Sequence, residues 1–369
     1  VHAEQNNIVL PNSYMNPDED YWFWDYVYTG YGLEKKTFNI DIKGVADVSS
    51  DATLTVKLQG FTETGVHPDH HVRISINNHI IEVPDKQDFW DGTEAKTLVL
   101  TFDQGLLFEG ANSIEVEALK DTGAPYSMFY INSFDLAYQR LYEASGDSLA
   151  FNAENNPVVS VYGYTSPDIF VFNITDPQSP SIYAATAVDF DGESYSVSLI
   201  PVYPAGRYLA ATADTAVTVT DISADTPSNL KSKKNRADYI IITPEHFIST
   251  AQSLSDYRNG KRLSTMIISV EDIMDEFNYG ISSPLAIRDF LMYAHLMWKK
   301  PPKYVVLAGD ATYDYRDNLD KGENLVPTLI VSTPLGLFPS DNSLADTDGD
   351  HLPDMSIGRL PVLTTTELQ

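Results

Sequence analysis

The stretch Ala237-Asp238-Tyr239-Ile240-Ile241-Ile242-Thr243 decides the fold of the last third of the chain. It contains a short, continuous apolar run, which is typical of a β-strand buried on both faces of a parallel sheet. Two similar runs follow it, at residues 264–270 and 304–310. The three runs together predict a parallel sheet.

Helical patterns separate these apolar runs. Residues 247–259 have helical spacing and are followed by Gly260, a common helix stop. A second predicted helix covers residues 283–300, with Ser283 as N-cap and Pro284 at the first helical position. Because parallel strands need crossover connections, the alternation of strand and helix predicts an α/β domain with right-handed crossovers.

The preceding sequence has a different pattern. Residues 5–143 contain runs in which apolar and polar side chains alternate, as at 53–58 and 71–76, and turn residues separate them. We predict an antiparallel β-sandwich of the jelly-roll type over residues 1–143 and a smaller immunoglobulin-like β-sandwich over residues 144–232. The polar segment 225–235 is the predicted linker, and the α/β domain occupies residues 233–369.

Composition excludes several classes of function. The chain has 369 residues, 24 basic and 52 acidic side chains, a formal net charge of −28 and no cysteine. Such acidity argues against binding to nucleic acid or to anionic lipid, and no apolar run is long enough for a membrane span. Residues 233–369 carry a net charge of −6, which leaves −22 for residues 1–232. Acidic β domains of this kind fit an extracellular or cell-surface setting.

Five segments of the α/β part resemble, in order, the catalytic domain of the gingipain-like cysteine peptidases, which have a caspase-like fold. The segments are 237–243, 270–280, 284–291, 304–316, and 340–341 leading to 357–362. The β region is similar to the non-catalytic N-terminal portion of family members related to the sortase of the type IX secretion system. The resemblance implies a mixed fold, with two antiparallel β-sandwich domains (jelly-roll and immunoglobulin-like) followed by the first part of a caspase-like α/β domain.

The resemblance supplies no catalytic residue in this sequence. The family's histidine lies in a Gly-His-Gly-type motif beyond the segment that matches Gly358-Arg359-Leu360-Pro361, and its cysteine lies further still. Thiol catalysis needs a thiolate within reach of a base, and this sequence has no cysteine. We therefore expect these residues to be the N-terminal portion of a secreted cysteine endopeptidase that acts on protein or peptide substrates. The rest of the peptidase domain would be its partner, and this segment alone would be inactive. An open sheet edge or an exposed apolar helix face is expected.

The sharpest local motif is an acidic loop at residues 346–354. Asp346, Asp348, Asp350 and Asp354 occupy positions 1, 3, 5 and 9 of this loop, with a Gly between two of them, and oxygen ligands at this spacing suit Ca²⁺. Ser340 with Asp341 could add ligands. An acidic turn without an ion is the alternative interpretation.

Three other groups of residues have a structural and a functional interpretation. His67, His70 and His71 could bind a transition metal, although a solvated loop is favoured. Asp310, Asp314 and Asp317 follow an apolar run, where substrate-cleft residues occur in α/β sheets, but turn formation is favoured. The aromatic runs 21–26 and 89–90 could stack on a sugar, although burial in the core is favoured.

These groups define a second functional hypothesis. The acidic β domains would then form a calcium-dependent adhesion or glycan-binding module of a cell-surface protein, or a pro-region that shields an active site.

Overall fold

The computed structural model describes residues 1–184, 186–202, 206–220, 222, 224–322 and 324–369. The chain divides into two compact units. The first unit contains residues 1–5 and 23–222, and the second contains residues 6–22 and 223–369. None of the helices in the described ranges is long and apolar enough to cross a membrane.

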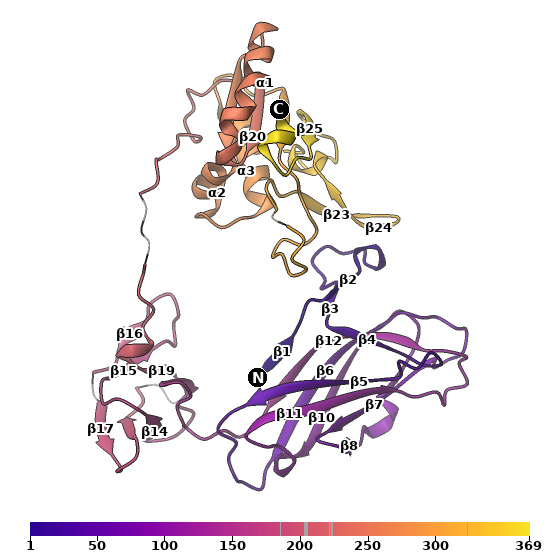
Figure 1. Ribbon diagram of the computed structural model, residues 1–369, viewed down its shortest axis with the longest axis vertical. Helices are drawn as coiled ribbons and strands as arrows, with labels where there is room; N and C mark the ends of the chain where they lie inside the picture. Colours follow the sequence, from indigo (N-terminus) through magenta and orange to yellow (C-terminus); the bar gives the residue numbers. More distant parts are fainter. Residues whose placement is uncertain (185, 203–205, 221, 223, 323) are drawn as a thin grey trace. The chain divides into compact units, whose positions relative to one another are not determined.

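Two antiparallel sheets build the first β-sandwich (Figure 1). One sheet contains β1 (His2–Glu4), β4 (Asp25–Tyr28), β6 (Asp51–Gly60), β10 (Ala95–Asp103) and β12 (Met128–Ala137). The other contains β5 (Lys35–Ile42), β7 (His70–Ile76), β8 (His79–Ile81), β9 (Phe89–Trp90) and β11 (Gly110–Ala118). The alternation in the sequence buries one face of each strand, as Leu54, Val56 and Leu58 of β6 illustrate. Side chains from both sheets form one core.

A smaller pair of antiparallel sheets follows. The first has the order β13 (Ser148–Asn152), β19 (Arg207–Thr212), β15 (Ile169–Asn173), β16 (Ser181–Ile182). The second has the order β14 (Val159–Tyr164), β18 (Tyr195–Leu199), β17 (Thr186–Phe190). Their shared core is centred on Tyr164 and Tyr208, which are both fully buried. The predicted fold class, two antiparallel sandwiches and then a parallel sheet, is confirmed.

A four-stranded parallel sheet forms the centre of the second unit. Its order is β21 (Thr265–Ser269), β20 (Tyr239–Thr243), β22 (Tyr304–Ala308), β25 (Ser356–Leu360). The helices are α1 (Ile248–Gly260), α2 (Val270–Asn278), α3 (Pro284–Met297) and α4 (Thr365–Leu368). Ile240 and Ile242 pack with α2 and α3, whereas Tyr239 and Ile241 pack with α1 and α4. The deciding stretch is therefore buried on both faces, as predicted.

One helix prediction needs correction, and one helix was not predicted. Ser283 caps α3 as predicted, because its hydroxyl accepts the Leu285 N–H at 3.2 Å, but α3 ends at Met297 and not at Lys300. It ends there because Trp298 turns into extended backbone, and its indole N–H donates to the Leu230 carbonyl at 2.9 Å. Helix α2 was not predicted. It begins directly after β21, where the Ser269 hydroxyl caps it.

Smaller elements complete both units. In the sequence, a β-hairpin of β23 (Leu329–Thr333) and β24 (Gly336–Ser340) follows β22 and precedes β25. Strand β2 (Ile8–Val9) pairs with β3 (Trp22–Phe23). The short 3₁₀ turns are η1 (Pro11–Ser13), η2 (Pro84–Lys86), η3 (Gln104–Leu106), η4 (Ala213–Thr215), η5 (Glu245–Phe247) and η6 (Asn342–Leu344).

Part of the expected linker is packed against the second unit. Glu276 accepts hydrogen bonds from the Ser228 hydroxyl and from the backbone N–H groups of Leu230 and Lys231. Burial alone would raise the pKa of Glu276, but these hydrogen bonds hold it below its usual range. The boundaries predicted from the sequence also placed residues 6–22 with the first sandwich, whereas they pack with the α/β unit.

Candidate functional site

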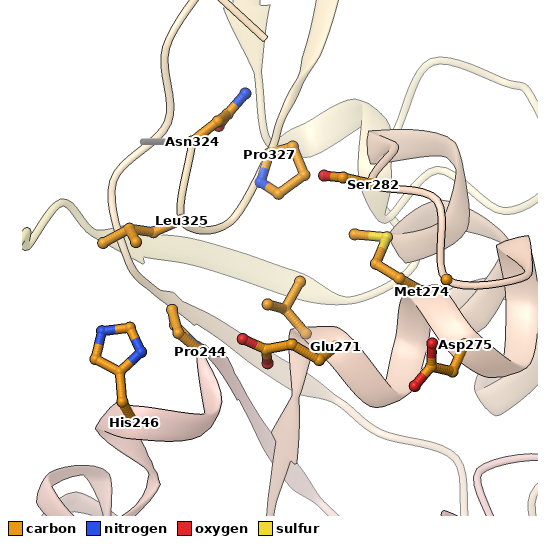
Figure 2. Close-up of a pocket in the computed structure, with 11 residues that line it drawn as sticks. Pro244, His246, Glu271, Met274, Asp275, Ser282, Asn324, Leu325 and Pro327 are labelled. Carbon is orange, nitrogen blue, oxygen red and sulfur yellow. The ribbon is translucent and has the colours of Figure 1, made fainter. Parts of the chain in front are cut away.

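A cavity of about 450 Å³ opens at the carboxyl edge of the parallel sheet (Figure 2). Pro244 and His246 line it directly after β20, and Val270 and Glu271 line it directly after β21. The segment 324–327 forms the opposite wall. Helix α2 and the turn that follows it add further lining residues, namely Met274, Asp275, Gly280 and Ser282.

The topology of the sheet explains why a cavity forms there. The chain runs from β20 to the edge strand β21 and then crosses back to β22 on the other side of β20. In open α/β sheets, the loops diverge where the strand order reverses in this way, and ligands bind in the resulting crevice. This cavity is therefore the candidate functional site.

The lining is acidic and partly apolar. Glu271 accepts the Glu245 N–H at 3.0 Å and a hydrogen bond from the Ser269 hydroxyl, and it lies in the first turn of α2, where the helix dipole favours a carboxylate. Asp275 lies one turn further along. No lysine or arginine is among the described lining residues. The cavity therefore favours a cationic or neutral ligand with an apolar body over an anion.

The charge along α2 is poorly compensated. The pKa of Asp272 is raised, first because the carboxyl is partly buried and then because Asp225, Asp275, Glu271 and Glu276 lie nearby. The carboxylates of α2 thus repel one another, which adds to the negative potential beside the cavity.

Arg359 of β25 connects the outer wall of the cavity to the sheet. Its Nε and Nη2 donate to the two carboxylate oxygens of Asp341 at 2.9 and 2.7 Å. Its Nη1 donates to the carbonyls of Gly309 and Val326, both at 2.7 Å. One guanidinium therefore fixes the end of β22, the wall segment at Val326 and the residue that follows β24. The sequence had suggested Asp341 as an extra cation ligand, but its carboxylate is paired with Arg359.

The three aspartates after β22 mainly form turns, as favoured from the sequence. Asp310 accepts the Ala311 N–H, Asp314 accepts the Leu319 N–H at 2.7 Å, and Asp317 accepts the N–H groups of Lys321 and Gly322. None of the three lines the cavity. The sequence indicated the correct edge of the sheet but missed His246, Glu271 and Asn324. A signal for Glu271 was present, since it follows the end of a buried strand and the N-cap Ser269.

Three of the four predicted cation ligands converge. Oxygen atoms of Asp346, Asp348 and Asp354 lie within 4.8 Å of one another, and Asp350 is outside this group. The loop is held by its own backbone, since Asp346 accepts the N–H groups of Gly349 and His351. Hydrogen bonds from the Thr347 hydroxyl and N–H lower the pKa of Asp354.

The histidines do not converge. His67 contacts Asp91, and His71 lies between Asp88 and Asp121. His70 is fully buried and contacts the Ser127 hydroxyl and the Gly92 carbonyl. Within the described ranges, the one metal-like group of His, Asp or Glu side chains is the acidic loop.

The predicted aromatic runs lie largely in cores. Phe23 is 1% exposed, Tyr21 7% and Trp90 6%. Phe89 stacks on His71, with ring centroids 3.8 Å apart. The favoured interpretation, burial instead of a sugar platform, agrees with these positions.

The strand order and the helices on both faces of the sheet define an open α/β domain built on a parallel sheet. Residues 232–369 match the family model of peptidase family C25. This match confirms the predicted resemblance of the α/β segment to the gingipain-like peptidases.

Solved structures extend the comparison to the β-sandwiches. The structure described as dimeric latent PorU from Porphyromonas gingivalis matches with a TM-score of 0.69 at 15% identity, over 100% of this chain and 36% of that chain. The complex of the pro- and mature domains of RgpB from the same organism matches with a TM-score of 0.27 at 19% identity, over 36% of this chain and 26% of that chain. No curated protein matched the chain. The first of these matches shows a shared fold, and this chain spans about a third of the length of that PorU chain.

Proposed function

We propose that the chain is the N-terminal portion of a secreted gingipain-like cysteine endopeptidase, whose cysteine and histidine lie outside these residues. The observation that carries the proposal is the match of residues 232–369 to peptidase family C25. The PorU-like fold of the whole chain supports it. In the complete enzyme, a cysteine thiolate would attack the scissile carbonyl of a protein substrate, and a histidine would protonate the leaving amine.

This chain would contribute scaffold and binding surface to that enzyme. The parallel sheet supplies the carboxyl edge, and β25 has a paired neighbour on one side only among the described strands, so its other edge can accept the rest of the domain. Leu285 and Leu296 of α3 are 46% and 65% exposed, which provides apolar surface for the same purpose. The net charge of −28 supports an extracellular location.

Two measurements test the peptidase proposal. Purified residues 1–369 should hydrolyse a fluorogenic protein substrate no faster than buffer does, because the sequence has no cysteine. The same chain extended by the downstream codons of its own gene should hydrolyse the substrate, and a Cys→Ala change in the extension should abolish turnover. Downstream codons that lack a cysteine and a histidine would contradict the proposal.

We also propose that the acidic loop binds Ca²⁺ through Asp346, Asp348 and Asp354. Three carboxylates close together repel one another unless a cation neutralises them, and oxygen ligands suit calcium. The bound ion would fix the loop that precedes β25. This site alone would be compatible with the adhesion alternative, but the burial of the aromatic runs gives no support to glycan binding.

Matched substitutions test the calcium proposal. Asp348→Asn should weaken Ca²⁺ binding by about tenfold or more in calorimetric titration, because it removes one charge from the converging group. Asp350→Asn should change the affinity little, although it removes the same charge from the same loop. Equal affinities for the two variants would show that the group does not act as a site.

A further inference from the structure

Residues 6–22, which we call the strap, leave the first β-sandwich and return to it. The strand before the strap, β1, pairs with β12 through Glu4 and Ser133. The strand after it, β4, pairs with the same strand through Asp25 and Ile131. The two ends of the strap are therefore held close together along one edge of β12. The strap is an excursion inserted where one continuous edge strand would otherwise run, and its closed ends limit the entropy that it loses on docking.

The strap has its own internal structure. Strand β2 pairs with β3, the Leu10 N–H donates to the Tyr21 carbonyl at 3.0 Å, and η1 forms the turn between them. Rings of Tyr14 and Tyr21 lie 6.3 Å apart. A preformed loop of this kind presents a fixed set of apolar side chains to a partner surface.

That partner surface is the β23–β24 hairpin of the α/β unit. Tyr21 of the strap and Ile330 and Leu337 of the hairpin are buried together, at 7%, 8% and 0% exposure. Four partly buried side chains pack around them, namely Val9, Tyr14, Trp22 and Tyr313. Burial raises the pKa of Tyr14 and of Tyr21, which is consistent with rings that are removed from water in this contact.

The backbones of the strap and the hairpin also approach each other closely. A Cβ atom placed on Gly336 would lie 2.6 Å from the Cα of Asn12 and 2.7 Å from its carbonyl oxygen. Only glycine allows η1 to lie this close to the first residue of β24. The sequence therefore has a glycine at a hairpin position that the backbone of the strap covers.

The hairpin is connected to the loop after β22 and to the wall of the cavity. The Tyr313 hydroxyl donates to the Leu337 carbonyl at 3.4 Å, and Tyr313 belongs to the strap cluster. Ile330 lies three residues after Pro327, which lines the cavity. The residues that contact the strap therefore lie only a few positions in sequence from the outer wall of the candidate site.

We propose that the β23–β24 hairpin is a docking surface for the chain's own residues 6–22, and that this contact within the second unit holds the loop after β22 in place. The partner is a preformed, aromatic-rich peptide loop of the same chain. Release of the strap would loosen the hairpin and the segment 310–316 without unfolding the parallel sheet. The proposal does not depend on the peptidase activity.

Two glycine substitutions test the contact in the full chain. Gly336 and Gly322 both have positive φ, +105° and +121°, so alanine costs backbone strain at either position. An added Cβ meets Asn12 at position 336, but it has no neighbour within 4 Å at position 322. In hydrogen exchange, Gly336→Ala should speed exchange of the strap about tenfold or more, whereas Gly322→Ala should leave it unchanged. Equal strap exchange in the two variants would overturn the proposal.

A variant that lacks the strap distinguishes the effect of losing the strap contact on hydrogen exchange from the effect of backbone strain within the hairpin. Residues 6–22 are replaced by a Gly/Ser segment of equal length, and retained protection of β12 shows that the sandwich is folded. Exchange in 310–316 and 329–340 should rise to the level of the Gly336→Ala variant. In the strapless chain, Gly336→Ala should then change hydrogen exchange no more than Gly322→Ala does, because the strap that the added Cβ would meet is gone. Unchanged exchange in the strapless chain, or a persisting effect of Gly336→Ala, would overturn the proposal.

Discussion

Replacing Arg359 by methionine is expected to lower the free energy of unfolding of the α/β unit by about 3 kcal/mol, the lower end of the cost of leaving one member of a buried ion pair unpaired, because this pair is only partly buried. The Arg359 side chain is 12% exposed and that of Asp341 is 23% exposed. Methionine keeps much of the apolar stem but removes all four donated hydrogen bonds. The Asp341 carboxylate and the carbonyls of Gly309 and Val326 then lose their shared donor.

Two control variants separate charge from geometry. Arg359→Lys keeps the positive charge but cannot donate to both carboxylate oxygens and two carbonyls from one planar group, so it should recover only part of the loss. Arg359→Met combined with Asp341→Asn should be less destabilised than Arg359→Met alone, because no partly buried charge is left unpaired. Because the chain has more than one unit, the readout is hydrogen exchange of β22 and β25, which reports on this unit alone.

The same pair predicts a pH dependence. Burial alone would raise the pKa of Asp341, but the hydrogen bond and charge of Arg359 hold it below its ordinary value. Below about pH 4 the Asp341 carboxylate therefore takes up a proton in the unfolded chain more readily than in the folded chain. The α/β unit should thus lose stability as the pH falls. In Arg359→Met the contribution of Arg359 to this lowering of the Asp341 pKa is removed, and the corresponding part of the acid destabilisation should vanish. Equal acid sensitivity of the two proteins would contradict the assignment.

The sequence predicted the sheet well because its signals are local. The sequence runs that form β20, β21 and β22 are apolar on both faces. This pattern is typical of buried parallel strands and not of loops or amphipathic helices. Ser283 and Pro284 together mark a helix start for a purely local reason. Helix α2 was missed because Val270 extends the apolar run of β21, so a strand interpretation continued past the N-cap at Ser269.

The remaining features depend on contacts that are distant in the sequence. The strap packs against residues about 300 positions away, and its strands are only two residues long, which is too short for a periodic signal. The cavity takes its lining from the ends of two neighbouring strands and from a segment near residue 325, which become adjacent only when the sheet forms. The acidic loop was predictable as a group because its carboxylates are neighbours in the sequence. Whether Asp350 joins that group depends on the turn at Gly349, which the pattern did not resolve.

Gly309→Ala is expected to destabilise the α/β unit by about 3 kcal/mol, at the upper end of the usual cost of overfilling a packed site. Gly309 follows β22, and a Cβ atom there would lie 2.7 Å from Val326 Cγ2 and 3.2 Å from Leu325 Cβ. The backbone has little freedom to move away. Its N–H donates to the Leu360 carbonyl at 3.1 Å, and its carbonyl accepts a hydrogen bond from Arg359.

The matched control is Gly358→Ala in β25. A Cβ atom at that position meets nothing within 4 Å, so the change should alter stability by less than about 0.5 kcal/mol. Hydrogen exchange of the Val326 amide, which donates to the Asp310 carbonyl at 3.1 Å, should accelerate in Gly309→Ala and not in Gly358→Ala. If both variants were equally stable, the 324–327 wall would be able to rearrange around an added methyl group. The candidate site would then be less rigid than its contacts imply. The predicted difference would instead mean that the end of β22 sets the position of that wall, so that the site's shape is fixed by a glycine outside its lining.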